Sequence, residues 1–289
     1  MGNPDHSLPT PTPTPTTQAG REGLAALLAR PDRAVVALDF DGTLAEIVPD
    51  PEQSRAHPGA VPALSALAPK VGSVAVITGR PAGIAVRYGG FAGVPGLDHL
   101  VVLGHYGAER WDAVTGTVNA PAPDPGVAGV REELPGVLRE AGAKTGDEDG
   151  VRVEDKGHAI AVHTRRAADP RAAFETLRGP LAALAARHGL IVEPGRLVLE
   201  LRPPGMDKGV ALEEYVRETG AESVLYAGDD LGDLAAYTAV DELRKSGVTG
   251  LLICSGGEVP ELAARADLLL PGPAAVVEYL ASLAQRIGA

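Results

Sequence analysis

The sequence has few cysteines and few basic residues relative to acidic ones. Cys254 is the single cysteine, so neither an intramolecular disulfide nor a metal site built from several thiolates can form. This favours a reducing, cytoplasmic location. The chain has 26 Lys and Arg against 38 Asp and Glu, a formal net charge of -12, which argues against a nucleic-acid partner. The net charge does not exclude a small anionic substrate, because a few local cations and a metal ion can hold a phosphate.

Long hydrophobic runs are also missing. No apolar run approaches the roughly 18 residues that a membrane-spanning helix requires, so we expect no membrane partner. The N-terminus lacks the basic and apolar segments of a secretory signal. Pro9–Thr17 (PTPTPTPTT) instead predicts an extended, solvated stretch, and we predict a disordered tail over residues 1–20. Hydrophobic residues still make up 45% of the chain, which is enough for a substantial core.

Short apolar runs alternate with helical patterns near both ends of the chain. Buried strands are predicted at Ala34–Leu38, Ser73–Ile77, Leu100–Leu103, Val224–Ala227, Val248–Ile253 and Leu268–Leu270. Helices are predicted at Val61–Leu67, from Pro81, from Lys208, and at Leu231–Ala239 and Ala274–Ala284. Strands that alternate with helices predict an α/β fold with a doubly wound, Rossmann-like parallel sheet.

The middle of the chain has a different pattern. Predicted helices near Val130–Ala141 and Pro170–His188 accompany paired strand candidates at Val151–Glu154, Ala159–Thr164, Leu190–Glu193 and Leu197–Leu201. Strands joined by tight turns favour an antiparallel sheet covered by two helices. We therefore predict an α+β unit at residues 120–204, inserted between core segments 21–119 and 205–289.

The strongest chemical signal is the segment Asp39-Phe40-Asp41-Gly42-Thr43, which directly follows a predicted buried strand. Residues two apart in an extended segment face the same way, so both carboxylates are expected to point into one site. Two carboxylates so close repel each other, and a hard cation such as Mg²⁺ relieves the repulsion. Gly42 allows a sharp turn. The alternative is an ordinary turn and helix cap at a strand end.

Three further segments lie at predicted strand ends or helix starts. Thr78-Gly79-Arg80-Pro81 offers a hydroxyl and free backbone N–H groups, an anion site, or else an N-cap. Lys208 begins a helix, where a cation opposes the macrodipole and is better explained by a negative neighbour. Gly228-Asp229-Asp230-Leu231-Gly232-Asp233 places acidic residues one turn apart. Because ligands bind at the carboxyl ends of strands in open α/β sheets, these segments together indicate one site.

In this order, the four segments resemble the motifs of the haloacid dehalogenase superfamily. The resemblance implies a phosphatase in which Asp39 attacks phosphorus and Asp41 acts as general acid and base. It implies that Thr78 and Lys208 hold the phosphoryl oxygens. It further implies that Mg²⁺ is held by Asp39, by the backbone carbonyl of Asp41 and by Asp229, with support from Asp230 or Asp233. The inserted unit then corresponds to an α/β cap over the site.

Within that superfamily the cap resembles that of trehalose-6-phosphate phosphatases. The segments that carry this resemblance are Val153–Gly157, Ala161–Arg165 and Gly195–Pro203. The resemblance implies that Glu154, Lys156 and Glu200 grip sugar hydroxyls, and it adds Arg80 and Arg165 to the substrate-binding residues. The chain departs from the family pattern at Tyr106, where a His is common, and at Gly232-Asp233-Leu234.

The expected function is therefore Mg²⁺-dependent hydrolysis of trehalose 6-phosphate, by a monomer with a small-molecule sugar phosphate as its partner. Other readings stay open at this point. One is a phosphatase of the same cap class that acts on sucrose phosphate or mannosyl-phosphoglycerate. Others are a phosphomannomutase-like enzyme and a phosphate-binding module without turnover.

Overall fold

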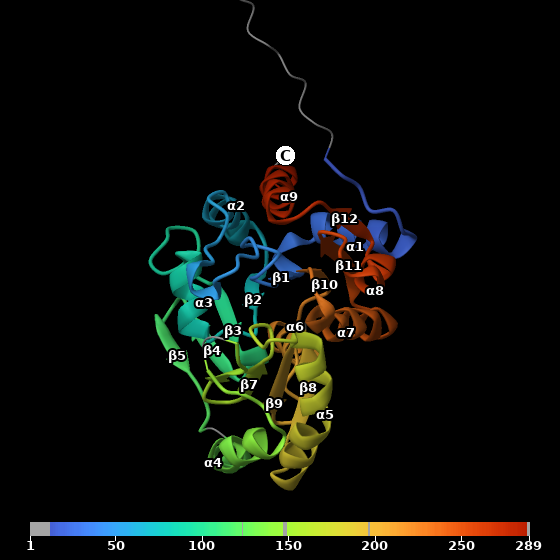
Figure 1. The fold of residues 1–289 in the computed structure, drawn as a ribbon. Coiled ribbons are helices and arrows are strands. Elements are labelled where there is room, and N and C mark those ends of the chain that lie inside the picture. The colour runs from blue at the N-terminus through green and yellow to red at the C-terminus, as the bar shows by residue number, and fades with distance from the viewer. Residues whose placement is uncertain (1–11, 123, 147–148, 196, 288–289) are drawn as a thin grey trace, which may run out of the picture.

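The computed structural model describes residues 12–122, 124–146, 149–195 and 197–287 (Figure 1). Residues 1–11 of the predicted tail lie outside this range. The tail prediction was wrong for Gln18–Gly20, because helix α1 (Gln18–Ala29) begins there. Thr17 caps this helix by accepting a hydrogen bond from the Gly20 amide, and buried side chains such as Leu24 and Leu27 hold it against the core.

The larger sheet has eight strands in the order β12-β11-β10-β1-β2-β3-β4-β5. The strands from β12 to β3 pair in parallel, and β4 and β5 extend the sheet as an antiparallel hairpin. Their bounds are β1 (Ala34–Leu38), β2 (Ser73–Ile77), β3 (Val101–Gly104), β4 (Glu109–Asp112), β5 (Thr117–Asn119), β10 (Ser223–Gly228), β11 (Thr249–Ser255) and β12 (Leu268–Leu270). The predicted doubly wound α/β core is confirmed.

Helices cover both faces of this sheet, as the alternation of side chains along β1 illustrates. Val36 and Leu38 pack into one core with α1, α2 (Ala60–Leu67), α3 (Ala82–Gly89) and α9 (Pro273–Arg286). Val35 and Ala37 face a second core with α6 (Lys208–Thr219), α7 (Leu234–Lys245) and α8 (Pro260–Arg265). Burial on both faces explains why β1 is apolar throughout. Single 3₁₀ turns lie at Pro31–Arg33, Pro51–Gln53, Ala68–Lys70, His105–Gly107 and Leu231–Asp233.

The inserted unit contains a separate antiparallel sheet in the order β6-β7-β9-β8. Its strands are β6 (Arg152–Asp155), β7 (Ile160–His163), β8 (Ile191–Gly195) and β9 (Val198–Arg202), and its helices are α4 (Pro125–Glu140) and α5 (Pro170–Arg187). Ile160, Val162, Leu199 and Leu201 pack against these helices. The opposite face is free of them. The domain limits at residues 120 and 204 stay a prediction.

The charged row of this second sheet lies on its helix-free face. Glu154 pairs with Ala161, which pairs with Glu200, which pairs with Glu193. Directly opposed residues share a face, so the sheet presents three carboxylates away from its own hydrophobic core.

In the described residues, no helix is long and apolar enough to cross a bilayer.

Candidate active site

Asp39 lies at the carboxyl end of β1, where its amide donates to the carbonyl of Ala227 on the neighbouring strand β10. The residue is only 4% exposed. Lys208 Nζ lies 2.7 Å from Asp39 Oδ1 and 2.7 Å from Asp233 Oδ1, and its side chain is equally buried. The first residue of α6 is therefore a cation with two anionic partners, as its unfavourable place at a helix N-terminus predicts.

The ionisation of this cluster reflects burial and crowding of like charges. Burial raises the pKa of Asp39 well above its usual range, and the nearby carboxylates of Asp233 and Asp229 add to the effect, whereas Lys208 opposes it. Burial lowers the pKa of Lys208, but the attraction of Asp233 and Asp39 outweighs this and raises it above its usual value. The lysine therefore stays charged, whereas Asp39 holds its proton more tightly than a solvated aspartate does.

Asp233 connects the members of this cluster by accepting four hydrogen bonds. Its Oδ1 accepts hydrogen bonds from Lys208 Nζ at 2.7 Å and from the Tyr226 hydroxyl at 2.6 Å. Its Oδ2 accepts from the amides of Asp229 and Asp230 at 2.9 and 3.0 Å. A carboxylate with four donors is a positioning group, since it has little capacity left for a metal ion. The supporting role of Asp233 at a metal ion stays a prediction.

Asp229 offers a free ligand atom. One carboxylate oxygen of each of Asp39, Asp229 and Asp233 lies within 4.8 Å of the others. Asp229 Oδ1 is buried and has no hydrogen-bond partner among the described residues. A Cβ at Gly42 would come within 2.0 Å of Asp229 Oδ2, so the turn after Asp41 needs glycine. Burial and the charges of Asp233 and Asp230 raise the pKa of Asp229 to about 7.

Asp41 and Arg80 form a fork at the mouth of the site. Arg80 Nε donates to Asp41 Oδ2 at 2.6 Å, and a terminal guanidinium nitrogen donates to Oδ1 at 2.7 Å. Ser54 Oγ donates to the same Oδ1 at 3.1 Å. Thr78 is buried at the end of β2, and its hydroxyl accepts from the Arg80 amide. Asp41 and Thr78 therefore lie just after the carboxyl ends of β1 and β2, as the sequence predicted.

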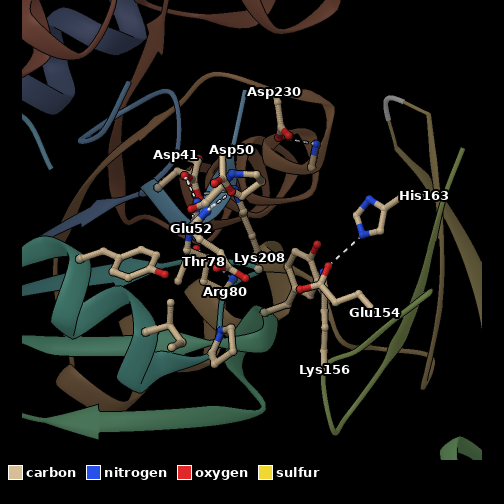
Figure 2. A pocket seen from close by; sticks show the side chains of 18 of the residues that line it. Asp41, Asp50, Glu52, Thr78, Arg80, Glu154, Lys156, His163, Lys208 and Asp230 are labelled. Carbon is tan, nitrogen blue, oxygen red and sulfur yellow. Dashed lines mark hydrogen bonds and ion pairs between the residues drawn. The ribbon is translucent and has the colours of Figure 1, made fainter. Parts of the chain in front are cut away.

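A cavity of about 590 Å³ joins these groups to the inserted unit (Figure 2). Its walls include Asp39, Asp41, Thr78, Arg80 and Lys208 from the core and Glu154 and Lys156 from the second sheet. The volume lies within the range of about 300–1,000 Å³ that small-molecule sites occupy. The charged residues of the core and the helix-free face of the inserted sheet therefore line the same cavity.

The predicted cap residues form two charged pairs. Glu154 Oε2 lies 2.8 Å from His163 Nε2, and this contact lowers the pKa of Glu154 despite its partial burial. Lys156 Nζ forms an ion pair with Glu200, which is itself almost fully buried behind the cavity wall. Burial acts against the charge of Lys156, but Glu200 and Tyr106 raise its pKa above the ordinary value. Arg165 is exposed and is not one of the cavity residues, so the structure does not bring it to the site.

Several cavity residues were missed from the sequence: Asp50, Glu52, Tyr88, Tyr106, Arg152 and His163. Two of them carried a usable signal. Arg152 is two residues before Glu154 on one strand, and His163 is two residues after Ala161 on the next, so the period of the strand places them on the same face. Asp50 caps the single 3₁₀ turn Pro51–Gln53 and Glu52 lies in it, and so short a turn has no periodicity that predicts direction.

The mainly parallel core sheet, the buried Asp39 that follows its first strand and the antiparallel sheet of the inserted unit have the fold of the haloacid dehalogenase superfamily. The particular family follows from sequence comparison. The model of the trehalose-phosphatase family matches residues 37–268, and the chain belongs to this family.

Individual relatives agree with that assignment. The chain is 30% identical over 268 residues to a probable trehalose-phosphate phosphatase of Sinorhizobium fredii, covering 92% of this chain and 93% of that protein. It is 34% identical over 273 residues to trehalose-phosphate phosphatase of Mycobacterium marinum, covering 90% of this chain. It spans only 65% of the length of that mycobacterial relative. The C-terminal domain of Candida albicans trehalose-6-phosphate phosphatase shares the fold, with a TM-score of 0.74 at 20% identity, over 96% of this chain and 99% of that one.

Proposed function

We propose that this chain is a Mg²⁺-dependent phosphatase that hydrolyses trehalose 6-phosphate to trehalose and phosphate through an aspartyl-phosphate intermediate. The observation that carries the proposal is the single cavity that contains both the Asp39–Lys208 pair and the charged face of the cap. Family membership and the names of the relatives support the same substrate.

Asp39 attacks phosphorus in this proposal, and the sugar oxygen leaves. Lys208 neutralises charge on the phosphoryl oxygens, and the buried hydroxyl of Thr78 is available to donate to them. Asp41 protonates the leaving oxygen and then activates the water that hydrolyses the acyl phosphate. In the free protein, Arg80 donates hydrogen bonds to both oxygens of Asp41. In this proposal the substrate phosphate competes with Asp41 for the guanidinium of Arg80, so Arg80 changes partners when substrate binds.

A divalent cation suits the residues present. Oxygen donors dominate the cluster, and Oδ1 of Asp229 is buried without a hydrogen-bond partner among the described residues. Burial, with neighbouring carboxylates adding to it, raises the pKa of Asp39 and of Asp229, and a bound cation would oppose this effect. Asp39, Asp229 and the backbone carbonyl of Asp41 would hold Mg²⁺, with Asp233 and Asp230 ordering the loop. When bound, Mg²⁺ supplies charge neutralisation for phosphoryl transfer.

The cap supplies the contacts to the sugar. Glu154 lines the cavity as an acceptor for hydroxyl groups, and Lys156 lines it as a donor whose position is fixed by Glu200. Charge-assisted hydrogen bonds of this kind reject analogues that lack the hydroxyl, because the buried charges then lose their partners. Arg165 has no contact that supports a role in this proposal. We further propose that the protein acts as a monomer in the reducing cytoplasm, consistent with its one buried cysteine.

The test is phosphate release from four substrates, each with Mg²⁺ and with a chelator. The panel contains trehalose 6-phosphate, sucrose 6-phosphate, glucose 6-phosphate and mannosyl-phosphoglycerate. We expect Mg²⁺-dependent release with a strong preference for trehalose 6-phosphate. Preference for another substrate would keep the phosphatase chemistry and overturn the sugar assignment. No release from any of them would overturn the proposed function.

A further inference from the structure

A second group of metal-ligating side chains lies outside the carboxylate cluster. His105 and Glu109 belong to the core, between β3 and the start of β4, and His158 belongs to the turn between the cap strands β6 and β7. One ligand atom of each lies within 4.8 Å of the others. The two imidazole rings are in contact, with centroids 5.7 Å apart. None of the three residues lines the 590 Å³ cavity.

His105 is poorly satisfied where it lies. The residue is 2% exposed, and neither of its ring nitrogens has a hydrogen-bond partner among the described residues. Nδ1 comes within 3.3 Å of Glu109 Oε1 without hydrogen-bond geometry. Burying a polar group without a partner is costly, so these two ring nitrogens are candidates to bind a ligand.

The backbone holds His105 in this position. His105 and Tyr106 both have positive φ, 46° and 59°, which is unusual for two successive residues other than glycine. Their amides donate to the carbonyls of Arg80 and Thr78 at 2.9 and 3.0 Å. The imidazole is thus fixed to the loop that carries the predicted phosphate-binding residues, and it points to the cap.

We propose that His105, Glu109 and His158 form a binding site for a borderline transition-metal ion, Zn²⁺ in the first instance, which links the core to the cap. Two imidazoles and one carboxylate are a ligand set for Zn²⁺ and not for Mg²⁺, which prefers oxygen donors only. Tetrahedral bonds of 2.0–2.1 Å place ligand atoms about 3.3 Å apart, so contraction by about 1.5 Å at most completes the site.

Occupation of this site has a structural consequence. His158 lies two residues after Lys156 in a turn closed by the hydrogen bond from the Lys156 amide to the Ala159 carbonyl. A metal ion at His158 therefore holds the turn that carries Lys156 against the loop that carries Thr78 and Arg80. The fourth coordination position is left for water.

The test is Zn²⁺ binding to the chelator-stripped full chain, measured by competition with a chromophoric chelator in excess Mg²⁺. We expect one Zn²⁺ per chain, and affinity lower by about 100-fold or more in His105→Ala and His158→Ala, since even outer partners of a metal ligand cost 10–100-fold. Co²⁺ should give tetrahedral absorption bands that vanish in both variants. His188→Ala is the matched control, because His188 also contacts a carboxylate, Glu133 at 3.0 Å, within the cap.

Asp229→Asn separates this site from the carboxylate cluster and should leave Zn²⁺ affinity unchanged. No Zn²⁺ binding in excess Mg²⁺ would overturn the proposal, as would binding that survives His158→Ala and disappears in Asp229→Asn. His158 lies in a turn, so its variant keeps the test decisive even if His105→Ala fails to fold. The readout is binding, and it stands independently of phosphatase activity.

Discussion

Charged side chains meet in two regions of the cavity, and the two differ in how firmly they are held. In the core, the side chains of Asp39, Lys208 and Asp233 are at most 5% exposed, and Asp233 alone accepts four hydrogen bonds. In the cap, Glu154 and His163 are 44% and 37% exposed and contact each other once. In the proposed function, the core holds its charges in fixed positions for phosphoryl transfer, whereas Glu154 and His163 can exchange partners when a sugar binds.

The largest effect should come from Asp39→Asn, which removes the nucleophile from the fixed region. We expect phosphate release to fall by about 10⁴-fold or more, since loss of a nucleophile in other hydrolases has effects of this size. The amide is isosteric, so the thermal unfolding transition should persist. Asp98→Asn, in an exposed loop, is the matched control and should keep full activity. Substantial activity in Asp39→Asn, with deamidation excluded by mass spectrometry, would overturn the nucleophile assignment.

Asp233→Asn tests whether the core owes its rigidity to this one carboxylate. The amide keeps one acceptor oxygen and loses the charge, so either Lys208 or the amides of Asp229 and Asp230 lose their acceptor. We expect the free energy of unfolding to fall by about 3 kcal/mol, as for other buried ion pairs that lose one partner. Urea denaturation measures this. Asp230 belongs to the same capping box but is exposed, and Asp230→Asn should cost less than about 1 kcal/mol. Equal losses in both variants would contradict the organising role of Asp233.

Glu154→Gln and Lys156→Met test the cap side of the cavity. Each should raise the KM for trehalose 6-phosphate by about 10- to 100-fold, which corresponds to the loss of about 1.4 to 2.7 kcal/mol of charged hydrogen bonding. Hydrolysis of a small aryl phosphate, which has no sugar, should change little. Glu193→Gln is the matched control, because Glu193 lies in the same cross-strand row but is not a cavity residue. A parallel loss on both substrates would place these residues in the chemistry instead of in sugar binding.

The difference between the core and the cap regions of the cavity also explains which residues could be located from the sequence. Strand ends and the motifs on them are local features, so Asp39, Thr78, Lys208 and Asp229 were located from buried runs and helix starts. The family resemblance named Glu154 and Glu200, and the strand register of the structure places both on one face of the cap sheet. The strand ends and the motifs on them could be predicted because each depends on residues that are close together in the sequence.

The contacts between side chains could not be predicted from these sequence patterns. The fork between Arg80 and Asp41 joins residues 39 positions apart through rotamers that no periodicity specifies. Helix α1 was hidden because its start lies against a Pro/Thr-rich stretch, although Thr17 is a good N-cap. Arg165 shows the opposite error: it follows the right strand, but the chain has left the sheet by that residue, and its side chain is exposed.

The smallest effect expected is a pH dependence of stability from Asp229, which lies at the edge of the fixed region. Its folded-state pKa of about 7 lies above its ordinary value of 3.8, mainly because of burial and then because of Asp233 and Asp230. The metal-free folded protein therefore holds this proton more tightly than the unfolded chain does. The resulting stabilisation is complete below the ordinary pKa and is lost as the pH rises through about 7.

Asp229→Asn stays neutral at every pH, so the comparison with the unmodified chain isolates this contribution. Without metal, the variant should gain stability relative to the unmodified chain between about pH 5 and about pH 8, because only the latter acquires a buried charge. With Mg²⁺ the sign should reverse, since the cation binds the ionised carboxylate and raises the Tm of the unmodified chain more at about pH 8 than at about pH 5. Thermal melts of both proteins, with and without Mg²⁺, provide the four curves. If the two metal-free curves ran parallel across this range, Asp229 would not be the group that carries the unbalanced charge.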